Sequence, residues 1–363
     1  MQIFDFGIAH CWEYDIDFVT KLEAVLKQQK MSVIQVTFDN VKQVTEKVKK
    51  GTLHIRNYLD RAWDEDEIFG NLGKLLVANN TRIFNHYDKV PHAIDKATMH
   101  LEFITAGLNV PYSIIIPPLS EAENIYISLK DLAVLGRPFI IKPCNTTGGG
   151  VGVVTGAETL SEILRERFVN TNDKYLLQKK IYPKYFNGKR GWFRCFWAFN
   201  EAIPLWWDDT THAYQPLSGN EVLHYELEPL FSLTQKIAGI IELDFFSTEI
   251  AIDDQHTFIV IDYVNDQCDM RMQSSHFDGV PDYVVDKIIV NLLNEVALTK
   301  PRRTRTISKK AVVVEKTPVK KVVAKVAKPT KKETPAKKVT AKKLTAAVKT
   351  KKAETKKKKP ETK

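Results

Sequence analysis

The composition of the chain changes abruptly after Lys300, and this change limits how much of it can fold. Residues 301–363 contain 24 Lys and Arg against 4 Glu, and no aromatic residue. Dense like charge and repeated proline prevent the burial of a hydrophobic core. We therefore expect residues 301–363 to form a disordered Lys/Ala/Pro-rich basic tail. The preceding 300 residues, with 29 basic and 40 acidic side chains, should form an acidic folded body.

The first 90 residues alternate short apolar runs with amphipathic stretches. The expected elements are helices at 18–29 and 41–50 and strands at 32–38 and 52–58. Strands spaced by helices are typical of an α/β layer with a parallel sheet. A polar stretch at 79–87 indicates the first domain boundary.

The next 210 residues mix helices with strands that lie close together in sequence, as in α+β subdomains. The expected helices are at 90–110, 121–135, 158–168 and 281–298, and the expected strands at 111–117, 138–141, 175–181, 192–199, 242–253 and 257–264. The last two strands are joined by a polar turn at 253–256, which is typical of an antiparallel hairpin.

The sharpest local feature is a lysine on an apolar strand, followed by glycines. Lys142 lies in the run Phe-Ile-Ile-Lys-Pro, and three glycines at 148–150 follow. A buried ammonium requires an anionic partner, and glycines let backbone N–H groups approach phosphate oxygens. The pattern favours a phosphate site, although a glycine hairpin beside a lysine whose ammonium reaches solvent would also fit. It is not a Walker loop, because its lysine precedes the glycines.

A second feature is the acidic hairpin that carries Glu249, Asp262 and Asn265. Folding its strands about the turn brings Glu249 nearly opposite Asp262. Two carboxylates and an amide oxygen suit Mg²⁺, which keeps waters and substrate phosphates as its other ligands. An exposed edge strand with solvated acids is the alternative, and spacing alone leaves Asp244 as a competitor of Glu249. Residues 267–269, beside this strand, are candidates for lining an acceptor pocket.

The four cysteines of the chain are scattered, without a C-x-x-C pair. This spacing predicts reduced thiols rather than a disulfide framework or a zinc site. The first residues lack the basic region of a signal peptide, and no apolar run approaches the ~20 residues that span a bilayer. We therefore expect a cytoplasmic protein without a membrane partner.

Taken in order, these features resemble the ATP-grasp superfamily, which includes the ATP-binding domain of glutathione synthetase and other carboxylate–amine ligases. The resemblance covers residues 85–272, roughly half of the chain. It implies that Lys96, in the Asp-Lys pair before Gly-Leu-Asn-Val-Pro, contacts ATP phosphate, and that Lys142 is the second phosphate-binding lysine. The implied phosphate-covering residues are Thr147, Gly148, Gly149 and Gly150.

The resemblance also implies which residues contact the adenine base of ATP and which face the acyl intermediate. The strand at 175–181 matches the one that ends at the hinge against adenine. The implied cofactor-binding residues there are Gln178, Lys180 and Ile181. Arg194 matches the arginine that faces phosphate or the acyl intermediate. Arg271 is a second candidate for this role, with a surface ion pair to Asp269 as an equally good alternative.

For the metal, the resemblance implies that Glu249, Asp262 and Asn265 hold two Mg²⁺ ions, with Mn²⁺ as an alternative. The acid-to-acid separation in the family favours Glu249 over Asp244. Three positions depart from the family pattern: Lys179 replaces the usual hinge acid, Trp192 replaces the acid two residues before the arginine, and the final Glu-x-Asn is stretched to Asp262-Tyr-Val-Asn265.

The implied organisation has three parts. Residues 1–90 would form an α/β pre-ATP-grasp domain, and residues 91–300 an ATP-grasp domain of two α+β subdomains with a hinge at 178–182. The basic tail at 301–363 would follow. The implied activity is the ATP-dependent joining of a small-molecule or peptide carboxylate to an amine through an acyl phosphate. The alternatives are a kinase of the same fold that phosphorylates a hydroxyl, and a non-catalytic nucleotide-binding module with a nucleic-acid-binding arm.

The tail resembles the Lys/Ala/Pro-rich arms of linker histones such as histone H1 in composition. Lysines without aromatic residues suit contact with the phosphate backbone by counterion release. A solubilising extension and an intramolecular partner for the acidic body are the alternatives.

We predict that truncation after Lys300 abolishes retention on DNA or RNA at low salt and leaves ATP turnover intact. The reason is that the acidic body repels polyanions, so nucleic-acid affinity should reside in the tail. Retention of the truncated and full-length chains on a nucleic-acid column measures this directly. Equal retention of both would contradict the tethering role.

Overall fold

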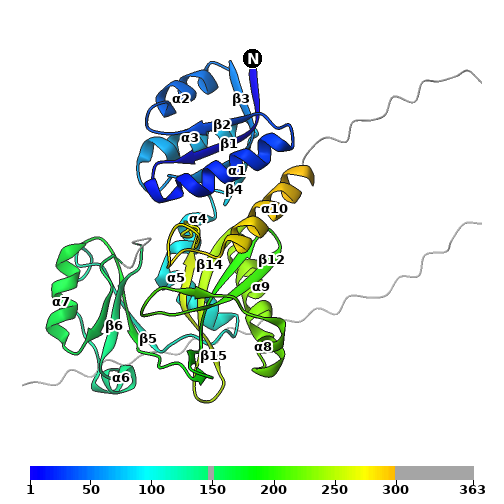
Figure 1. Ribbon diagram of the computed structural model, residues 1–363. Coiled ribbons are helices and arrows are strands. Elements are labelled where there is room, and N and C mark those ends of the chain that lie inside the picture. The colour runs from blue at the N-terminus through cyan, green and yellow to red at the C-terminus, as the bar shows by residue number, and fades with distance from the viewer. Residues whose placement is uncertain (146–150, 299–363) are drawn as a thin grey trace, which may run out of the picture. The chain divides into compact units, whose positions relative to one another are not determined.

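The structure, a computed structural model, describes residues 1–145 and 151–298 (Figure 1). Met1–Arg302 form one compact unit, and the four hydrophobic cores of the described residues all lie within it. Three sheets with helices packed on them confirm the expected mixture of α/β and α+β layers. The expected disordered tail and the phosphate-covering loop residues 146–150 lie outside the described part of the chain.

The first sheet is built from four parallel strands in the order β2-β1-β3-β4. Its elements are β1 Gln2–His10, a 3₁₀ turn Glu13–Asp15, α1 Ile16–Gln28, β2 Val33–Val36, α2 Val41–Lys49, β3 Leu53–Arg61, α3 Glu67–Ala78 and β4 Arg82–Phe84. The prediction of a parallel α/β layer is confirmed. The sequence analysis assigned no element to β1, α3 or β4, although β1 lies in the middle of the sheet and becomes fully buried toward His10.

A tyrosine links α3 to the carboxyl end of β3. The Tyr87 hydroxyl donates a hydrogen bond to the Asp60 carboxylate at the end of β3. A Cβ atom at Gly73, on α3, would lie 2.0 Å from that hydroxyl oxygen. Gly73 is therefore the residue that allows Tyr87 to pass beside the helix and reach Asp60.

The second sheet contains four strands in the order β5-β8-β6-β7, each antiparallel to its neighbour. Its elements are β5 Ser113–Ile116, α6 Leu129–Leu135, β6 Phe139–Pro143, β7 Val154–Ala157, α7 Leu160–Val169 and β8 Tyr175–Lys179. Side chains alternate between its faces. Ile141 and Leu177 pack in one core with Leu135 of α6 and Ile163 of α7, so Lys142 and its neighbours of like parity point to the opposite face.

The helix predicted at 121–135 is wrong over its first half, because α6 begins only at Leu129. Arg167 of α7 is fully buried and donates hydrogen bonds to the backbone carbonyls of Pro117, Pro118, Ala122 and Glu123. These carbonyls are thus committed to a side chain. A continuous helix would have used those of residues 122 and 123 for its own ladder.

The single helix predicted at 90–110 is also wrong. The chain forms two helices, α4 Val90–Ile94 and α5 Lys96–Thr105. Asp95 between them is extended, and its carboxylate accepts a hydrogen bond from the backbone N–H of Thr98. Asp95 therefore caps a new helix, as short acidic side chains do at N-termini, and also pairs with Lys174.

The third sheet is antiparallel, with the order β13-β12-β11-β14-β15. Its elements are β9 Tyr185–Phe186 and β10 Lys189–Arg190 as a short ribbon, β11 Trp192–Ala198, β12 Glu201–Trp207, β13 Tyr214–Gln215, α8 Gly219–His224, α9 Pro229–Ile241, β14 Phe245–Ile252, β15 Phe258–Asn265 and α10 Asp282–Leu298. One face packs with α10 and α1 and the other with α4, α5 and α9. None of the helices within 1–145 and 151–298 is long and apolar enough to cross a membrane.

We predict that Gly73→Ala destabilises the protein, although alanine normally stabilises a helix interior over glycine by about 0.5–1 kcal/mol. Its methyl group overlaps Tyr87, and overpacking of this kind typically costs about 1–3 kcal/mol. Gly70→Ala on the same helix is the matched control, because its nearest neighbour would lie 3.9 Å away. Chemical denaturation of both variants should give changes of opposite sign, and a stabilised Gly73→Ala would contradict the role of this glycine.

Candidate functional site

The second and third sheets face each other through polar side chains of β6 and β8. Lys142 Nζ donates a hydrogen bond to the backbone carbonyl of Ile261 in β15, at 3.2 Å. Gln178 Nε2 donates to the same carbonyl, at 3.1 Å. Both side chains are buried. The lysine predicted to bind phosphate is thereby held against the acidic hairpin.

The hairpin places its two acids opposite each other. Glu249 of β14 is the register partner of Asp262 of β15, and Ser247 is the partner of Asn265. The register shifts on either side of Glu249, and Thr248 donates its hydroxyl hydrogen bond to the carbonyl of Asp262 at 2.9 Å. The arrangement expected from folding the strands about their turn is therefore present in the structure.

Cations from two sheets neutralise this acidic pair. Arg194 of β11 contacts Glu249 Oε1 at 2.6 Å, and its guanidinium lies 4.5 Å from the ring centre of Trp207. Trp192 Nε1 donates a hydrogen bond to the other oxygen of Glu249, at 3.0 Å. Lys142 lies 3.5 Å from Asp262 Oδ1. The sequence analysis noted Trp192 only as a departure from the family pattern and did not predict its bond to the acid.

The pKa values of the two carboxyl groups are shifted in opposite directions because their neighbours differ. Burial, with the negative charge of Asp262, raises the pKa of Glu249 despite the attraction of Arg194. Burial also opposes ionisation of Asp262, but the attraction of Lys142, Lys96 and Arg194 outweighs it, so the pKa of Asp262 is lowered. Asp262 is therefore the carboxylate that stays ionised most readily.

The residues of this hairpin fit a magnesium ion that also binds a nucleotide. The Asp262 side chain is 32 % exposed, whereas that of Glu249 is 10 % exposed and already accepts from Arg194 and Trp192. Among the described residues, no group of three or more His, Cys, Asp or Glu side chains could hold a metal ion. Two carboxylates with one amide suit Mg²⁺ completed by phosphates and water rather than by a protein cage.

The competing acid, Asp244, does not reach this pair. It precedes β14, accepts a hydrogen bond from the backbone N–H of Asn85 at 3.1 Å, and lies 4.0 Å from Arg82. Ser247 already pairs with Asn265 at the end of β15, so Asp244 lies beyond the paired part of the hairpin. The geometry favours Glu249 as the acid facing Asp262.

The other residues assigned from the sequence fall into four groups. Lys96 begins α5, and its charge lowers the pKa of Asp262, which places it near the hairpin. Lys180 and Ile181 follow directly after β8, where the hinge was expected. Arg271 is paired with Asp269 at 2.6 Å and with Asp278 at 2.9 Å, which is the structural role left open by the sequence. Thr147, Gly148, Gly149 and Gly150 lie outside the described residues.

A buried ion pair attaches the first sheet to the segment that follows β15. Arg61, at the end of β3, contacts Asp15 at 2.7 Å, and their side chains are 2 % and 1 % exposed. Arg61 also donates a hydrogen bond to the backbone carbonyl of Cys268, at 2.8 Å. The carboxyl edge of the parallel sheet therefore meets the end of the acidic hairpin.

Comparisons with known proteins rest on structure. No family model matches the chain, and no curated protein matches its sequence. The D-alanine–D-alanine ligase of Bacillus anthracis, solved with ATP, has a TM-score of 0.58 at 15% identity, covering 82% of this chain and 98% of its own. The RimK domain ATP-grasp protein of Sphaerobacter thermophilus has a TM-score of 0.54 at 15% identity, covering 80% of this chain and 98% of its own.

A third similar structure is the ATP-grasp ligase PsnB with its minimal precursor, Mg and ADP. It has a TM-score of 0.51 at 13% identity, covering 79% of this chain and 98% of its own. These likenesses extend over almost the whole length of each known protein. The chain has the ATP-grasp fold.

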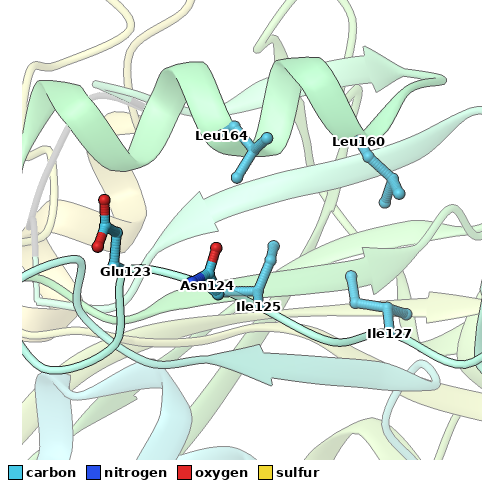
Figure 2. A pocket seen from close by; sticks show the side chains of 6 residues that line it. All are labelled: Glu123, Asn124, Ile125, Ile127, Leu160 and Leu164. Atoms are coloured by element: carbon cyan, nitrogen blue, oxygen red, sulfur yellow. The ribbon is translucent and has the colours of Figure 1, made fainter. Parts of the chain in front are cut away.

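One pocket of this ATP-grasp fold lies away from the acidic hairpin. A shallow pocket of about 170 Å³ lies between α7 and residues 123–127. In Figure 2, Leu160 and Leu164 extend from α7 toward Ile125 and Ile127. Because α7 covers the face of the second sheet away from Lys142, this pocket is separate from the candidate nucleotide site.

A second polar cluster of the ATP-grasp fold was not found from the sequence. Asp60 is the penultimate residue of β3, and Asp266 directly follows β15; both are buried. Trp63 Nε1 donates a hydrogen bond to Asp266 Oδ2, at 3.0 Å. Gln267 Nε2 donates to the backbone carbonyl of Asp60, at 3.2 Å. Of its residues, the sequence indicated only Gln267, through its position beside the strand that carries Asp262 and Asn265.

We predict that Asp60 makes the protein less stable as the pH rises from about 4 to about 6. Burial, with a smaller contribution from Asp64, raises the pKa of Asp60 from 3.8 to about 6. Between these values the folded state binds more protons than the unfolded state, so stability falls with rising pH. The difference between a pKa of 3.8 and one of about 6 corresponds to an effect of about 3 kcal/mol.

Asp60→Asn should therefore not show this loss of stability with rising pH. The difference in free energy of unfolding between Asp60→Asn and the wild type should be more positive at pH 7 than at pH 4, by that order of magnitude, so that the variant gains relative stability as the pH rises. The exposed Asp254→Asn, in the β14–β15 turn, is the control. A difference between Asp60→Asn and wild type that stays constant across the pH range would exclude a raised pKa at Asp60.

Proposed function

We propose that the chain is an ATP- and Mg²⁺-dependent ligase that joins a carboxylate to an amine through an acyl phosphate. The observation that carries this proposal is a row of charges in which Lys142 of the second sheet contacts Asp262, Asp262 faces Glu249, and Glu249 contacts Arg194. Such a row offers a cation for polyphosphate, acids for its metal ion and a second cation beyond them. The fold neighbours named as ligases, one of them solved with ATP, support the same class.

The nucleotide would be held by cations and by backbone amides. Lys96 and Lys142 would neutralise phosphate charge. Asp262, Glu249 and Asn265 would hold Mg²⁺, which would neutralise negative charge on the phosphates. Gln178, Lys180 and Ile181 would form the adenine side of the site. Lys142 is already oriented by its bond to the Ile261 carbonyl, so little side-chain entropy is lost on binding.

The proposed reaction has two steps. A carboxylate oxygen of the substrate forms a bond to the γ-phosphorus of ATP, and the bond to ADP breaks. The acceptor nitrogen then attacks the acyl carbon, the bond to phosphate breaks, and the nitrogen releases a proton as the amide forms. Arg194, held rigidly between Glu249 and Trp207, would act as a preorganised donor for the charge on the acyl phosphate.

We predict that residues 1–302 bind ATP·Mg²⁺ and that Lys142→Ala and Asp262→Asn abolish this binding. Nucleotide at 100 times its Kd should stabilise the wild type by about 2.7 kcal/mol. Lys287→Ala is the matched control, because Lys287 of α10 forms an exposed ion pair with Glu201 of β12, and such pairs contribute little. A thermal-shift titration with and without Mg²⁺ measures the effect.

The second half of the test asks which product forms. With ATP, Mg²⁺ and a panel of carboxylates, hydroxylamine should trap the acyl phosphate as a hydroxamate and release inorganic phosphate. A stable phosphoester would instead indicate the kinase alternative. Binding of ATP·Mg²⁺ without turnover across the panel would favour the non-catalytic module. No binding in the wild type would remove the enzyme proposal altogether.

The tail would add a tether to nucleic acid or another polyanion, as its composition predicts. This part of the proposal rests on the sequence of residues 301–363 alone. The truncation experiment described for the tail tests it independently of the ligase reaction.

A further inference from the structure

The cluster around Asp60 and Asp266 has more hydrogen-bond acceptors than donors. Asp60 is 6 % exposed and accepts from the Tyr87 hydroxyl and from the backbone N–H of Ala62 at 2.9 Å. Asp266 is 2 % exposed, and only its Oδ2 atom accepts, from Trp63 and from Gln267 at 3.4 Å. The remaining oxygens are Asp266 Oδ1 and Gln267 Oε1. Both are buried, and neither has a hydrogen-bond partner in the described part of the chain.

No cation of the described residues forms an ion pair with either carboxylate of this cluster. The ion pairs of residues 1–145 and 151–298 include neither Asp60 nor Asp266. Buried carboxylates without a cation are costly, and an unsatisfied buried acceptor adds about 1–3 kcal/mol. A cationic hydrogen-bond donor would offset both costs.

The position of the cluster connects it to the reaction. Asp266 directly follows Asn265, the end of β15, and Asp60 lies at the carboxyl end of β3 in a parallel sheet. Ligands of open α/β sheets bind outside the carboxyl ends of the strands. A ligand at the cluster would therefore lie next to the hairpin that is proposed to hold the nucleotide metal.

The two acceptors without a hydrogen-bond partner narrow the chemical class of ligand that would suit the cluster. A primary ammonium carries three N–H donors, no acceptor and a compact positive charge. It could donate to Asp266 Oδ1 and Gln267 Oε1 and still neutralise the carboxylates. A neutral hydroxyl would leave the charge uncompensated. A quaternary ammonium would compensate the charge but leave both acceptors unsatisfied.

We propose that Asp60, Asp266 and Gln267 bind the ammonium group of the acceptor, and that the acceptor is a cationic primary amine. Its nitrogen would pass one proton to a carboxylate of the cluster before it attacks, and would release a second proton as the amide forms. This inference rests on the proposed ligase function and names its amine substrate class. The chemistry is shared by two sources: a lysine side chain of residues 301–363 in the same chain, and a separate amine molecule.

The test measures the binding of cadaverine by calorimetry to residues 1–302, with and without a non-hydrolysable ATP analogue and Mg²⁺. Wild type should bind, and Asp60→Asn and Asp266→Asn should each weaken binding at least tenfold. Asp254→Asn, an exposed acid in the β14–β15 turn, should bind as wild type does. The bis-trimethylammonium analogue of cadaverine has the same charge without N–H donors, and it should not bind.

A retained ATP·Mg²⁺ thermal shift in each variant shows that it is folded and that its nucleotide site is intact. Loss of that shift in Asp266→Asn would overturn the proposal by placing Asp266 in the metal site. Equal binding of cadaverine and its quaternary analogue to the wild type would also overturn it, since charge alone would then explain binding. Cadaverine binding without nucleotide is measured separately. A failure to bind ATP, which would contradict the ligase function, is therefore distinguishable from a failure to bind cadaverine, which would contradict ammonium recognition.

The source of the amine follows from the same titration on the full chain. If lysines of the tail are the source, cadaverine should bind the full chain more weakly than residues 1–302, because the tethered lysines compete at high effective concentration. If the source is a separate amine, the two chains should bind cadaverine equally. Both outcomes support ammonium recognition, and absence of binding to residues 1–302 contradicts it.

Discussion

The site depends on two acids that the hairpin forces to face each other. Glu249 and Asp262 are direct register partners, and like charges in that position destabilise a sheet. The protein retains them because Arg194 and Lys142 approach from either side. Lys142 belongs to a different sheet, so its contact with β15 also fixes how the second and third sheets face each other. Removing either cation would leave a buried charge uncompensated, which typically costs several kcal/mol.

A second buried ion pair determines where the first sheet meets this site. Arg61 is held by Asp15 and by the backbone carbonyl of Cys268, which lies two residues after Asp266. Asp60 and Trp63 flank Arg61 in the chain. Anchoring Arg61 therefore positions Asp60 and Trp63 against Asp266, which is how residues some 200 positions apart form one cluster.

The sequence was sufficient for features that depend on neighbours in the chain. A polar turn between alternating strands predicted the hairpin and the facing of Glu249 and Asp262, and glycines after an apolar strand singled out Lys142. The helix expected at 90–110 failed at Asp95, because a capping carboxylate started a second helix there. The cluster of Asp60 and Asp266 was beyond reach, because its hydrogen bonds join residues separated by 203 and 207 positions.

The departure at Trp192 explains why the two acids of the hairpin are unequal. Its indole N–H and the Arg194 guanidinium occupy one oxygen each of Glu249, and burial disfavours the charged form of that acid. An acid at position 192 would have repelled Glu249, whereas a tryptophan donor stabilises it. Asp262 is more exposed and is kept ionised by Lys142. Metal affinity in this chain should therefore depend chiefly on Asp262, with Glu249 acting as the anchor that holds Arg194 in place.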